Sequence, residues 1–465
     1  MSEATNSVVL TMLKRLFSLP IISALTKNSQ AIKHQVIERE DHNISRRKIS
    51  HSAVKVMQRL GDGGYEAYLV GGGVRDLLLD DNPKDFDIAT NATPEQVKQL
   101  FRNSRIIGRR FKIVHVRFGR EIIEVTTFRD NHSDNTGNKQ SAKSNEGMLL
   151  RDNVYGDIQS DAIRRDFTIN ALYYTLDQFS IHDFTGGIRD IAERKIRIIG
   201  KAETRYQEDP VRMLRAVRFA GKLDFDIDKA TAAPIHKLGS LLRNIPAARL
   251  FEEVLKLFMG GYGSAVLPKL REYDLLQYVL PATDNALKND LPFADALFTQ
   301  ALINTDKRIK NNQRVTPAYI YAAMLWPSVC AEQEKLQKEG MQPVQAHQQA
   351  AQNIVSLQLQ TTSIPKRFTQ SMREIWDLQH RLSRRQGKRA ERLFEHPRFR
   401  AAYDFVLMRE EAGENMQGLG QWWTEYQEQD EAGRETMVAK VGQGKGQSRR
   451  RRSPRKRKPA APQNP

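Results

Sequence analysis

The sequence predicts an α+β protein with a small head that combines a mixed β-sheet with helices, then an all-helical neck and body, then a disordered basic tail. Residues 67–128 contain short apolar runs with strand spacing, interrupted by glycine turns. After Asp209, apolar residues recur at three- and four-residue spacing, which is typical of packed helices. From Gly442 onward the chain has nine Lys or Arg and no acidic residue, a composition that cannot bury a core.

The head begins with an apolar run at residues 67–70, which predicts a short buried strand. Gly71, Gly72 and Gly73 follow, and without side chains their backbone N–H groups can approach a phosphate closely. Helical spacing at 74–79 places a helix N-terminus beside these glycines, where free N–H groups and the helix dipole attract an anion. A glycine triplet alone also marks an ordinary tight turn, so the phosphate interpretation depends on the acidic residues nearby.

Two carboxylates, Asp85 and Asp87, come next and are separated by one residue. Residues i and i+2 of a strand face the same side, so both side chains are expected to project together. Adjacent carboxylates repel each other unless a cation lies between them, and Mg²⁺ prefers such oxygen ligands together with water and substrate phosphates. Two metal ions roughly 3.5–4 Å apart would activate a 3′-hydroxyl and stabilise a pyrophosphate leaving group. Together with the glycines, this pattern predicts nucleotidyl transfer.

A third carboxylate is expected from a predicted hairpin, whose strands are residues 111–118 and 121–128 with a turn at 119–120. Glu124 lies between two apolar residues of the second strand. A carboxylate in a half-buried strand needs a partner, and a metal shared with Asp85 and Asp87 would supply one. The alternative is that Glu124 faces water on the polar side of the hairpin.

Two further segments of the head have clear local signals. Thr93 and Gln96 form a capping box with proline at the first helical position, which predicts a helix from Pro94 to Phe101. The segment from Asp130 to Glu146 is polar and poor in apolar residues, which predicts a mobile loop near the site.

These residues resemble a known signature. Leu69 to Asp87 resembles that of the class II nucleotidyltransferases, the bacterial poly(A) polymerases and the tRNA CCA-adding enzymes. The resemblance extends to residues 164–170, similar to the family's ribose and triphosphate motif, and to residues 208–215, similar to its base-reading motif. Asp80 stands where the family usually has glycine, which concerns the geometry of a turn rather than the chemistry.

The resemblance implies roles for the acidic residues. Asp85 and Asp87 would bind metal and drive catalysis, Asp166 matches a carboxylate counted as catalytic, and Glu124 matches the third strand carboxylate. The sequence leaves open whether Glu124 or Asp166 completes the metal site. Without the resemblance, Arg164, Arg165 and Asp166 would be interpreted as a charge cluster at a helix start.

The resemblance also implies a nucleotide site, formed by Gly72, Gly73, Arg75, Arg165, Asp209, Arg212 and Arg215. Asp209 can accept a hydrogen bond from an exocyclic amine and Arg212 can donate to a ring nitrogen. Adenine and cytosine present that pattern, whereas guanine and uracil present the reverse and would leave polar groups unpaired. The pair therefore accepts ATP or CTP, and pocket shape must choose between them. The alternative is an ordinary i,i+3 ion pair on a helix face.

Four runs resemble the bacterial poly(A) polymerase I branch in particular: residues 106–115, 149–153, 249–253 and 384–389. This branch implies template-independent addition of AMP from ATP to RNA 3′ ends, promoting RNA decay, with Mg²⁺ as cofactor and Mn²⁺ as the other candidate ion. Two alternatives are kept. One is a CCA-adding tRNA nucleotidyltransferase, and the other is a non-catalytic RNA-binding adaptor built on an inactive transferase.

Composition gives the organisation and the expected partners. The net charge of +18 indicates a polyanion such as RNA. The predicted parts are a flexible extension (1–45), a catalytic head (46–160), a neck with the recognition motifs (161–265), a helical RNA-binding body (266–440) and the basic tail (441–465). RNA-decay or RNA-chaperone proteins are expected partners of a monomeric enzyme.

The chain carries one cysteine, Cys330, which excludes an intrachain disulfide and fits a reducing cytoplasm. No integral membrane span is expected. Residues 8–25 are fairly apolar but interrupted by charge and proline, which leaves a peripheral contact with the inner membrane or a flexible extension open. Met324, Trp326, Trp376 and Leu393 are expected in the core, and burial is favoured over base stacking for Trp422 and Trp423.

Overall fold

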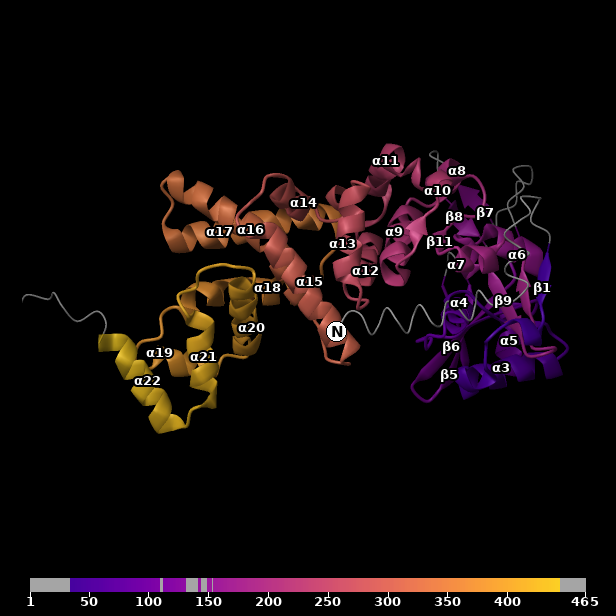
Figure 1. The fold of residues 1–465 in the computed structure, drawn as a ribbon, viewed down its shortest axis with the longest axis horizontal. Helices are drawn as coiled ribbons and strands as arrows, with labels where there is room; N and C mark the ends of the chain where they lie inside the picture. Colours follow the sequence, from indigo (N-terminus) through magenta and orange to yellow (C-terminus); the bar gives the residue numbers. More distant parts are fainter. Residues whose placement is uncertain (1–33, 109–111, 131–140, 144–148, 153, 444–465) are drawn as a thin grey trace, which may run out of the picture. The chain divides into compact units, whose positions relative to one another are not determined.

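The computed structural model describes residues 34–108, 112–130, 141–143, 149–152 and 154–443, and its chain divides into two compact units (Figure 1). The first comprises Met1–Pro281, Ile309–Asn311 and Gln360–Ser363, and the second comprises Ala282–Arg308, Asn312–Leu359 and Ile364–Pro465. The predicted domain limits stay predictions. The N-terminal segment 8–25, most of the predicted loop 130–146 and the tail from residue 444 lie outside the described residues.

The first unit contains a mixed eight-stranded sheet, as predicted, in the order β1-β10-β9-β2-β3-β6-β5-β4. Every neighbouring pair is antiparallel except β3 and β6, which run parallel. The strands of this sheet are β1 (Gln35–Ile37), β2 (Ala67–Val70), β3 (Asp87–Thr90), β4 (Ser104–Ile107), β5 (Ile113–Phe118), β6 (Glu121–Thr127), β9 (Leu172–Thr175) and β10 (Ile181–Asp183). The predicted strand at 67–70 and the predicted hairpin are confirmed.

Two small pairings complete the strands of the described chain. β7 (Ser141–Lys143) pairs antiparallel with β8 (Leu149–Asp152), so three residues of the predicted loop form a strand instead. β11 (Lys195–Ile196) pairs parallel with β12 (Asp226–Ile227). The polar composition of residues 130–146 concealed this short hairpin because it carries almost no apolar alternation.

One face of the large sheet is covered by α3 (His51–Asp62), which packs against β2, β3 and β6. Its buried residues recur at helical spacing, and Ser50 caps its first turn by accepting from the backbone N–H of Ala53. α5 (Pro94–Leu100) has the predicted capping box between Thr93 and Gln96 and ends one residue earlier than expected. Leu69, Ile88 and Val125 lie side by side in the strand register and are fully buried.

The glycine turn leads directly into α4 (Gly72–Leu78), which therefore begins two residues before the predicted helix. After this helix Asp80 adopts a φ of 62°, the left-handed conformation that usually calls for glycine. Aspartate tolerates it better than most residues, and its carboxylate accepts a hydrogen bond from Lys48 Nζ at 2.6 Å. Asp80 therefore adopts the left-handed conformation that a glycine at this position would allow.

The remaining helices of the first unit lie between residues 158 and 272, the region that includes the motifs at 164–170 and 208–215. They are α6 (Ile158–Arg164), α7 (Gly187–Ala192), α8 (Ala202–Glu208), α9 (Val211–Leu223), α10 (Lys229–Ala232), α11 (Ile235–Leu238), α12 (Ala247–Phe258) and α13 (Gly263–Glu272). Short 3₁₀ turns lie at Arg39–Asp41, Arg46–Lys48, Thr168–Asn170, Gly239–Asn244 and Leu276–Tyr278.

The second unit is helical throughout its described residues, as predicted. Its helices are α14 (Pro281–Lys288), α15 (Ala294–Lys310), α16 (Pro317–Lys338), α17 (Pro343–Thr361), α18 (Lys366–Leu382), α19 (Arg389–Phe394), α20 (Phe399–Glu411), α21 (Leu419–Glu428) and α22 (Glu431–Gln443). α22 ends inside the predicted tail 441–465. No helix within the described ranges has the length and apolar content needed to cross a membrane.

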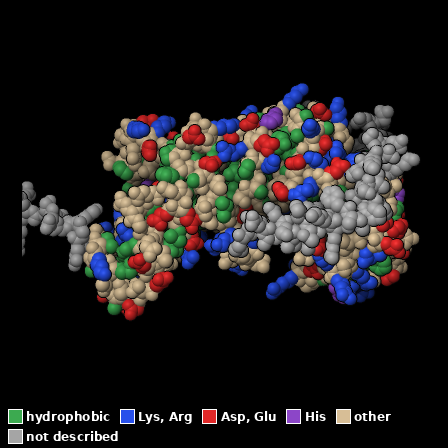
Figure 2. Space-filling view, in the orientation of Figure 1, with side chains coloured by type: hydrophobic (Ala, Val, Ile, Leu, Met, Phe, Trp, Pro, Cys, Tyr) green, Lys and Arg blue, Asp and Glu red, His purple; other side chains and the backbone are tan. Residues whose placement is uncertain are grey.

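The large aromatic residues of this unit are core residues. Trp376 and Trp423 are fully buried, and their indole N–H groups donate to the carbonyl oxygens of Ala322 and Leu382, each at 3.1 Å. Trp422 is half-buried and stacks on Tyr426. The expectation of burial over base stacking is therefore confirmed for Trp423. On the face drawn in Figure 2, acidic and basic side chains are interspersed over the described residues.

Candidate active site

Two carboxylates and one histidine form a row of neighbouring side chains across one face of the sheet. Strand register aligns Asp87 of β3 with Glu124 of β6, and Glu124 with His115 of β5. Partners in register project to the same face, so the two carboxylates are neighbours. The His115 Nε2 atom lies 3.2 Å from Glu124 Oε1. The sheet thus brings the predicted third carboxylate next to Asp87.

Asp85 precedes β3 rather than lying within it, which corrects the expectation that both aspartates belong to one strand. Buried Phe86 separates exposed Asp85 from half-buried Asp87. Burial raises the pKa of Asp87 to about 6, with further contributions from Glu124 and Asp85, while Arg165 opposes them. The three carboxylates therefore share one electrostatic environment.

This acidic environment fits a divalent cation. Among the described residues, no three His, Cys, Asp or Glu side chains converge as a complete metal site. Mg²⁺, however, usually takes only one or two carboxylates and completes its shell with water and substrate phosphates. Asp85 and Asp87 supply that number of oxygen ligands. A bound cation would offset the burial that chiefly raises the pKa of Asp87 and the repulsion from Glu124 and Asp85 that adds to it.

The raised pKa gives a pH-dependent prediction. The charged form of Asp87 is disfavoured in the folded metal-free protein. Ionisation of Asp87 therefore lowers the free energy of unfolding as pH rises from about 4 through about 6. Mg²⁺ should then raise the melting temperature more at about pH 7.5 than at about pH 5, because it binds the charged form. Thermal unfolding at both pH values, with and without Mg²⁺, measures this difference.

Asp87→Asn is the matched variant for that measurement. It should lose most of the Mg²⁺ effect, and the metal-free variant should be more stable than the parent at about pH 7.5, by at most about 3 kcal/mol. An equal Mg²⁺ effect at both pH values would contradict the electrostatic account of this residue.

The glycine turn and the aspartates are packed together. Gly71 has a φ of 76° and a ψ of −136°, a conformation that is open to glycine and not to other residues. A Cβ on Gly73 would lie 3.6 Å from the carbonyl oxygen of Asp85, an ordinary van der Waals distance, so the start of α4 and the aspartate loop are in contact. Gly72 meets the guanidinium of Arg75, whose Nη2 would lie 3.3 Å from an added Cβ.

Arg75 itself is buried, with 3% of its surface exposed. Its guanidinium donates to Asp76 Oδ1 at 2.8 and 2.6 Å and to Asn170 Oδ1 at 2.6 Å, and it lies over the ring of Phe219. These contacts place Arg75 behind the glycine turn rather than in an open pocket. Its predicted nucleotide contact stays a prediction, and in this structure the residue joins α4 to the motif at 164–170.

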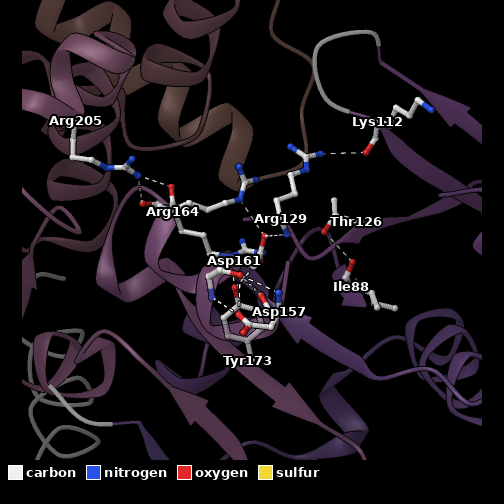
Figure 3. Close-up of polar contacts among 11 residues, drawn as sticks. Ile88, Lys112, Thr126, Arg129, Asp157, Asp161, Arg164, Tyr173 and Arg205 are labelled. Carbon is white, nitrogen blue, oxygen red and sulfur yellow. Dashed lines mark hydrogen bonds and ion pairs between the residues drawn. The ribbon is translucent and has the colours of Figure 1, made fainter. Parts of the chain in front are cut away.

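Asp161 is the centre of a cluster of polar side chains that includes Tyr173 and Arg164 (Figure 3). Its Oδ2 atom accepts from the Tyr173 hydroxyl at 2.7 Å and from Arg165 Nη2 at 2.9 Å. Its Oδ1 atom accepts from the backbone N–H of Arg129 at 3.2 Å. Burial would raise the pKa of Asp161, but Arg165, Arg164 and Tyr173 lower it overall, so the carboxylate stays charged.

This cluster orients Arg165. Its Nε and Nη2 atoms are bound to Asp161 and Tyr173, while Nη1 would lie 3.8 Å from a Cβ on Gly71 and makes no hydrogen bond in the described part of the chain. Arg165 also lowers the pKa of Asp87. The guanidinium therefore lies between the glycine turn and the carboxylates, where a triphosphate would need a cation. Arg164 ends α6 and Arg165 follows it, so the alternative of a helix start is wrong.

Asp166 is held by an ion pair. Its Oδ2 atom accepts from Arg215 Nε at 2.6 Å, and its Oδ1 atom accepts from the backbone of Phe167 and the side chain of Asn170. Burial would raise the pKa of Asp166, but Arg215 and these hydrogen bonds lower it to about 2. Asp166 thus pairs with Arg215 and is not among the groups that shift the pKa of Asp87.

The two predicted base-reading residues do not pair with each other. Asp209 Oδ2 accepts from Arg249 Nη2 at 2.7 Å, whereas Arg212 Nη1 donates to Glu208 Oε2 at 3.0 Å and to the carbonyl oxygen of Arg205 at 2.7 Å. The alternative of an ordinary i,i+3 ion pair is therefore wrong. Asp209 lies in the short link between α8 and α9, and Arg249 of α12 fixes its carboxylate.

Three family models match separate parts of this chain. Residues 67–197 match the poly A polymerase head domain, residues 224–287 match the probable RNA and SrmB-binding site of polymerase A, and residues 339–457 match the polymerase A arginine-rich C-terminus. Poly(A) polymerase I of Salmonella typhimurium is 50% identical over 429 residues, covering 91% of this chain and 92% of that protein. The chain belongs to the poly(A) polymerase I family.

Relatives from the other branch match less of the chain. The CCA-adding enzyme of Lactobacillus helveticus is 41% identical over 210 residues, covering 45% of this chain and 50% of that enzyme. Among solved structures, the Bacillus stearothermophilus CCA-adding enzyme in complex with CTP has a TM-score of 0.53 at 25% identity, covering 84% of this chain and 80% of that one. This chain thus shares its fold with a solved CCA-adding enzyme.

Sequence reasoning missed three residues of the site. Asp161 and Tyr173 orient Arg165, and the only local signal was the spacing of four residues between Asp161 and Arg165 on a helix. Arg249 lies in a run that resembles the poly(A) polymerase branch, but its partner Asp209 is 40 residues away. A contact of that range has no signal in a single sequence.

Proposed function

We propose that this polynucleotide adenylyltransferase transfers AMP from ATP to RNA 3′ ends at the face of the sheet that carries Asp85, Asp87 and Glu124. Membership of the poly(A) polymerase I family gives the reaction, which needs no template and releases pyrophosphate. The observation that carries the location is the row formed by Asp87 and Glu124 in register, with Arg165 and the glycine turn next to it.

The carboxylates would hold the metal. Asp85 and Asp87 are the proposed ligands of Mg²⁺, with Mn²⁺ as the other candidate, and Glu124 rather than Asp166 is the proposed third carboxylate because it shares the row of Asp87. A cation bound there would favour the deprotonated 3′-hydroxyl and stabilise the charge on the leaving pyrophosphate. Two such ions would serve the attacking and leaving oxygens separately.

The other residues would bind and orient the nucleotide. Arg165 presents Nη1 beside Gly71, so it is the proposed contact for the triphosphate together with the N–H groups of the glycine turn. Asp166 holds Arg215 and, through Asn170, meets Arg75, so we assign it a positioning role. These contacts fix the arginines before substrate binds and so reduce the ordering cost of the bound state.

Base choice is proposed to depend on Asp209 and Arg212. Arg249 leaves Asp209 Oδ1 with only a 3.3 Å contact to the backbone N–H of Val211, so this oxygen can accept from an exocyclic amine. Arg212 is held by Glu208 through one nitrogen, Nη1, and its Nη2 can donate to a ring nitrogen. Adenine and cytosine satisfy both groups, whereas uracil and guanine would leave them unpaired, so the pair rejects UTP and GTP and pocket shape chooses ATP over CTP.

A single-nucleotide assay tests the proposed function. Purified protein is incubated with RNA, Mg²⁺ and one nucleoside triphosphate at a time, in parallel with a tRNA that lacks its 3′ end. We expect long tails with ATP alone. Incorporation of CMP into the tRNA would favour the CCA-adding alternative, and no incorporation with either Mg²⁺ or Mn²⁺ would favour a non-catalytic adaptor.

The second unit offers a surface for the RNA chain. Four exposed arginines from the end of α18, the segment that follows it and α19 line a cavity of about 280 Å³, namely Arg381, Arg384, Arg389 and Arg392. No ion pair joins any of them to an acidic side chain within the described residues. Arginine binds phosphate through a planar fork of donors, so we propose that this cavity, called here the body arginine cluster, contacts the RNA backbone.

Reversing two charges of the body arginine cluster tests that role. Arg384→Glu with Arg389→Glu should weaken binding of single-stranded RNA about tenfold and reduce the salt dependence, since each lost phosphate contact removes about 0.7 from the slope. The control reverses two exposed basic residues of the same unit, Arg314→Glu with Lys338→Glu. Equal RNA affinity and equal salt slopes for both double variants would exclude the cluster from RNA binding.

A further inference from the structure

A second cavity lies in the first unit and has no part in the proposed transfer reaction. It has a volume of about 580 Å³ and is lined by arginines of the segment 39–47, by the start of α3 and by residues of β9 and the turn after it. Volumes of this size are typical of sites for small ligands. We call it the far-face cavity, because its position on the sheet is opposite to that of the carboxylates.

The strand register establishes that position. Tyr173 of β9 aligns with Val70 of β2, which aligns with Asp87, so these three side chains share the face of the candidate active site. Tyr174 is the next residue along β9 and therefore projects to the other face. Since Tyr174 lines the far-face cavity, a ligand there would be separated from Asp87 by the sheet itself.

The rim of the cavity is strongly cationic. Arg39, Arg46 and Arg47 line it, and its lining includes no acidic side chain. Arg46 and Arg47 are exposed and make no side-chain hydrogen bond or ion pair with any described residue, while Arg39 donates only to the carbonyl oxygen of His42, at 3.2 Å. Three guanidinium groups around one cavity repel each other unless an anion lies between them.

The floor and one wall are apolar. Ile49 and Tyr174 are the buried lining residues and are called here the floor, and Phe179, with 37% of its surface exposed, is called the wall. Phe179 has a φ of 55°, a conformation rarely adopted by a bulky residue. Its carbonyl oxygen accepts from His42 Nε2 at 2.7 Å, which anchors the strained turn to the arginine segment. Strain of this kind is often kept at binding sites.

We propose that the far-face cavity binds a nucleotide unit, with its phosphate on Arg46 and Arg47 and its base against Phe179 and the apolar floor. An arginine fork suits a phosphate, and a flat aromatic wall suits any base. The nucleotide unit belongs either to an RNA strand held away from the 3′ end or to a free mononucleotide.

The test uses the full chain with Arg46→Glu and Arg47→Glu, two exposed positions whose side chains make no hydrogen bond or ion pair with the described residues. Anisotropy of a labelled oligoadenylate, without divalent metal, measures the RNA source, and titration calorimetry with AMP measures the free nucleotide. If the source is RNA, oligoadenylate affinity falls about tenfold and the salt slope falls by about 1.4. If the source is free nucleotide, one equivalent of AMP binding is lost and RNA affinity is unchanged. In both cases kcat at saturating RNA should stay unchanged.

Matched variants complete the experiment. Arg117→Glu with Arg120→Glu makes the same charge change at the β5–β6 turn, near the other edge of the sheet. Phe179→Gly removes the ring, suits the positive φ and should lower the same affinity about tenfold. If Arg46→Glu with Arg47→Glu matches this control in both assays, the far-face cavity binds no nucleotide. Neither assay needs turnover, so a failure of the transfer reaction would not be mistaken for a failure of this site.

Discussion

Replacing Asp87 by asparagine is expected to abolish AMP addition while the protein stays folded. The change keeps the size of the side chain and removes the charge that a divalent cation needs. Metal stabilisation of a transferring phosphoryl group amounts to several kcal/mol, which corresponds to about 10³-fold or more in rate. Asp85→Asn should reduce the rate of AMP addition by a similar factor, because both carboxylates are proposed ligands of the same metal. A primer-extension assay with saturating ATP and RNA measures both.

Two comparisons show whether that loss is specific. Glu124→Gln should reduce the rate less than Asp87→Asn, because Glu124 is the third carboxylate of the row and also contacts His115. Glu121→Gln lies on the same strand three residues earlier, so its side chain projects to the other face and should leave the rate unchanged. Full extension by Asp85→Asn with Asp87→Asn would show that the carboxylates are not the metal site.

Replacing Asp166 by alanine is expected to destabilise the protein by about 3 kcal/mol, because half-buried Arg215 would lose the largely buried carboxylate that pairs with it. The lowered pKa of Asp166 gives the pH dependence. The charged carboxylate stabilises the fold above about pH 4, and this contribution is lost as pH falls toward about 2. Urea unfolding of the parent and Asp166→Ala at about pH 7 measures the difference.

A double variant separates positioning from direct catalysis. Asp166→Leu with Arg215→Met removes both charges and should recover much of the lost stability, since no charge is left without a partner. If Asp166 positions the arginines, the double variant should raise KM for ATP more than it lowers kcat at saturating ATP. A fall in kcat of about 10³-fold with unchanged KM would assign Asp166 to the chemical step. Equal stability of Asp166→Ala and the parent would contradict the ion-pair account.

Local signals were sufficient to predict most of the head. The strand at 67–70, the hairpin with its turn at 119–120 and the helix from Pro94 follow from periodicity, turn residues and a capping box, which all act within a few residues. The sequence could also predict which face of its own strand each of the carboxylates Asp87 and Glu124 occupies, because side chains alternate along β3 and β6. Their adjacency required the parallel pairing of β3 and β6, which local sequence does not encode.

The parts that could not be predicted depend on long-range contacts. Arg75 and Asn170 are 95 residues apart, Asp166 and Arg215 are 49 apart, and Asp209 and Arg249 are 40 apart. From the sequence alone, each of these arginines could bind a phosphate equally well. Only the fold shows that Arg75 is buried against Asp76, whereas Arg165 keeps one nitrogen directed toward the glycine turn.

The central claim is that Asp85 and Asp87 together hold a divalent cation next to the glycine turn. The most direct test is anomalous diffraction from crystals grown with Mn²⁺ and a non-hydrolysable ATP analogue. The account predicts an anomalous peak in contact with both carboxylates, with the triphosphate of the analogue beside Arg165. A peak at other residues, or a bound triphosphate on the opposite face of the sheet, would contradict it.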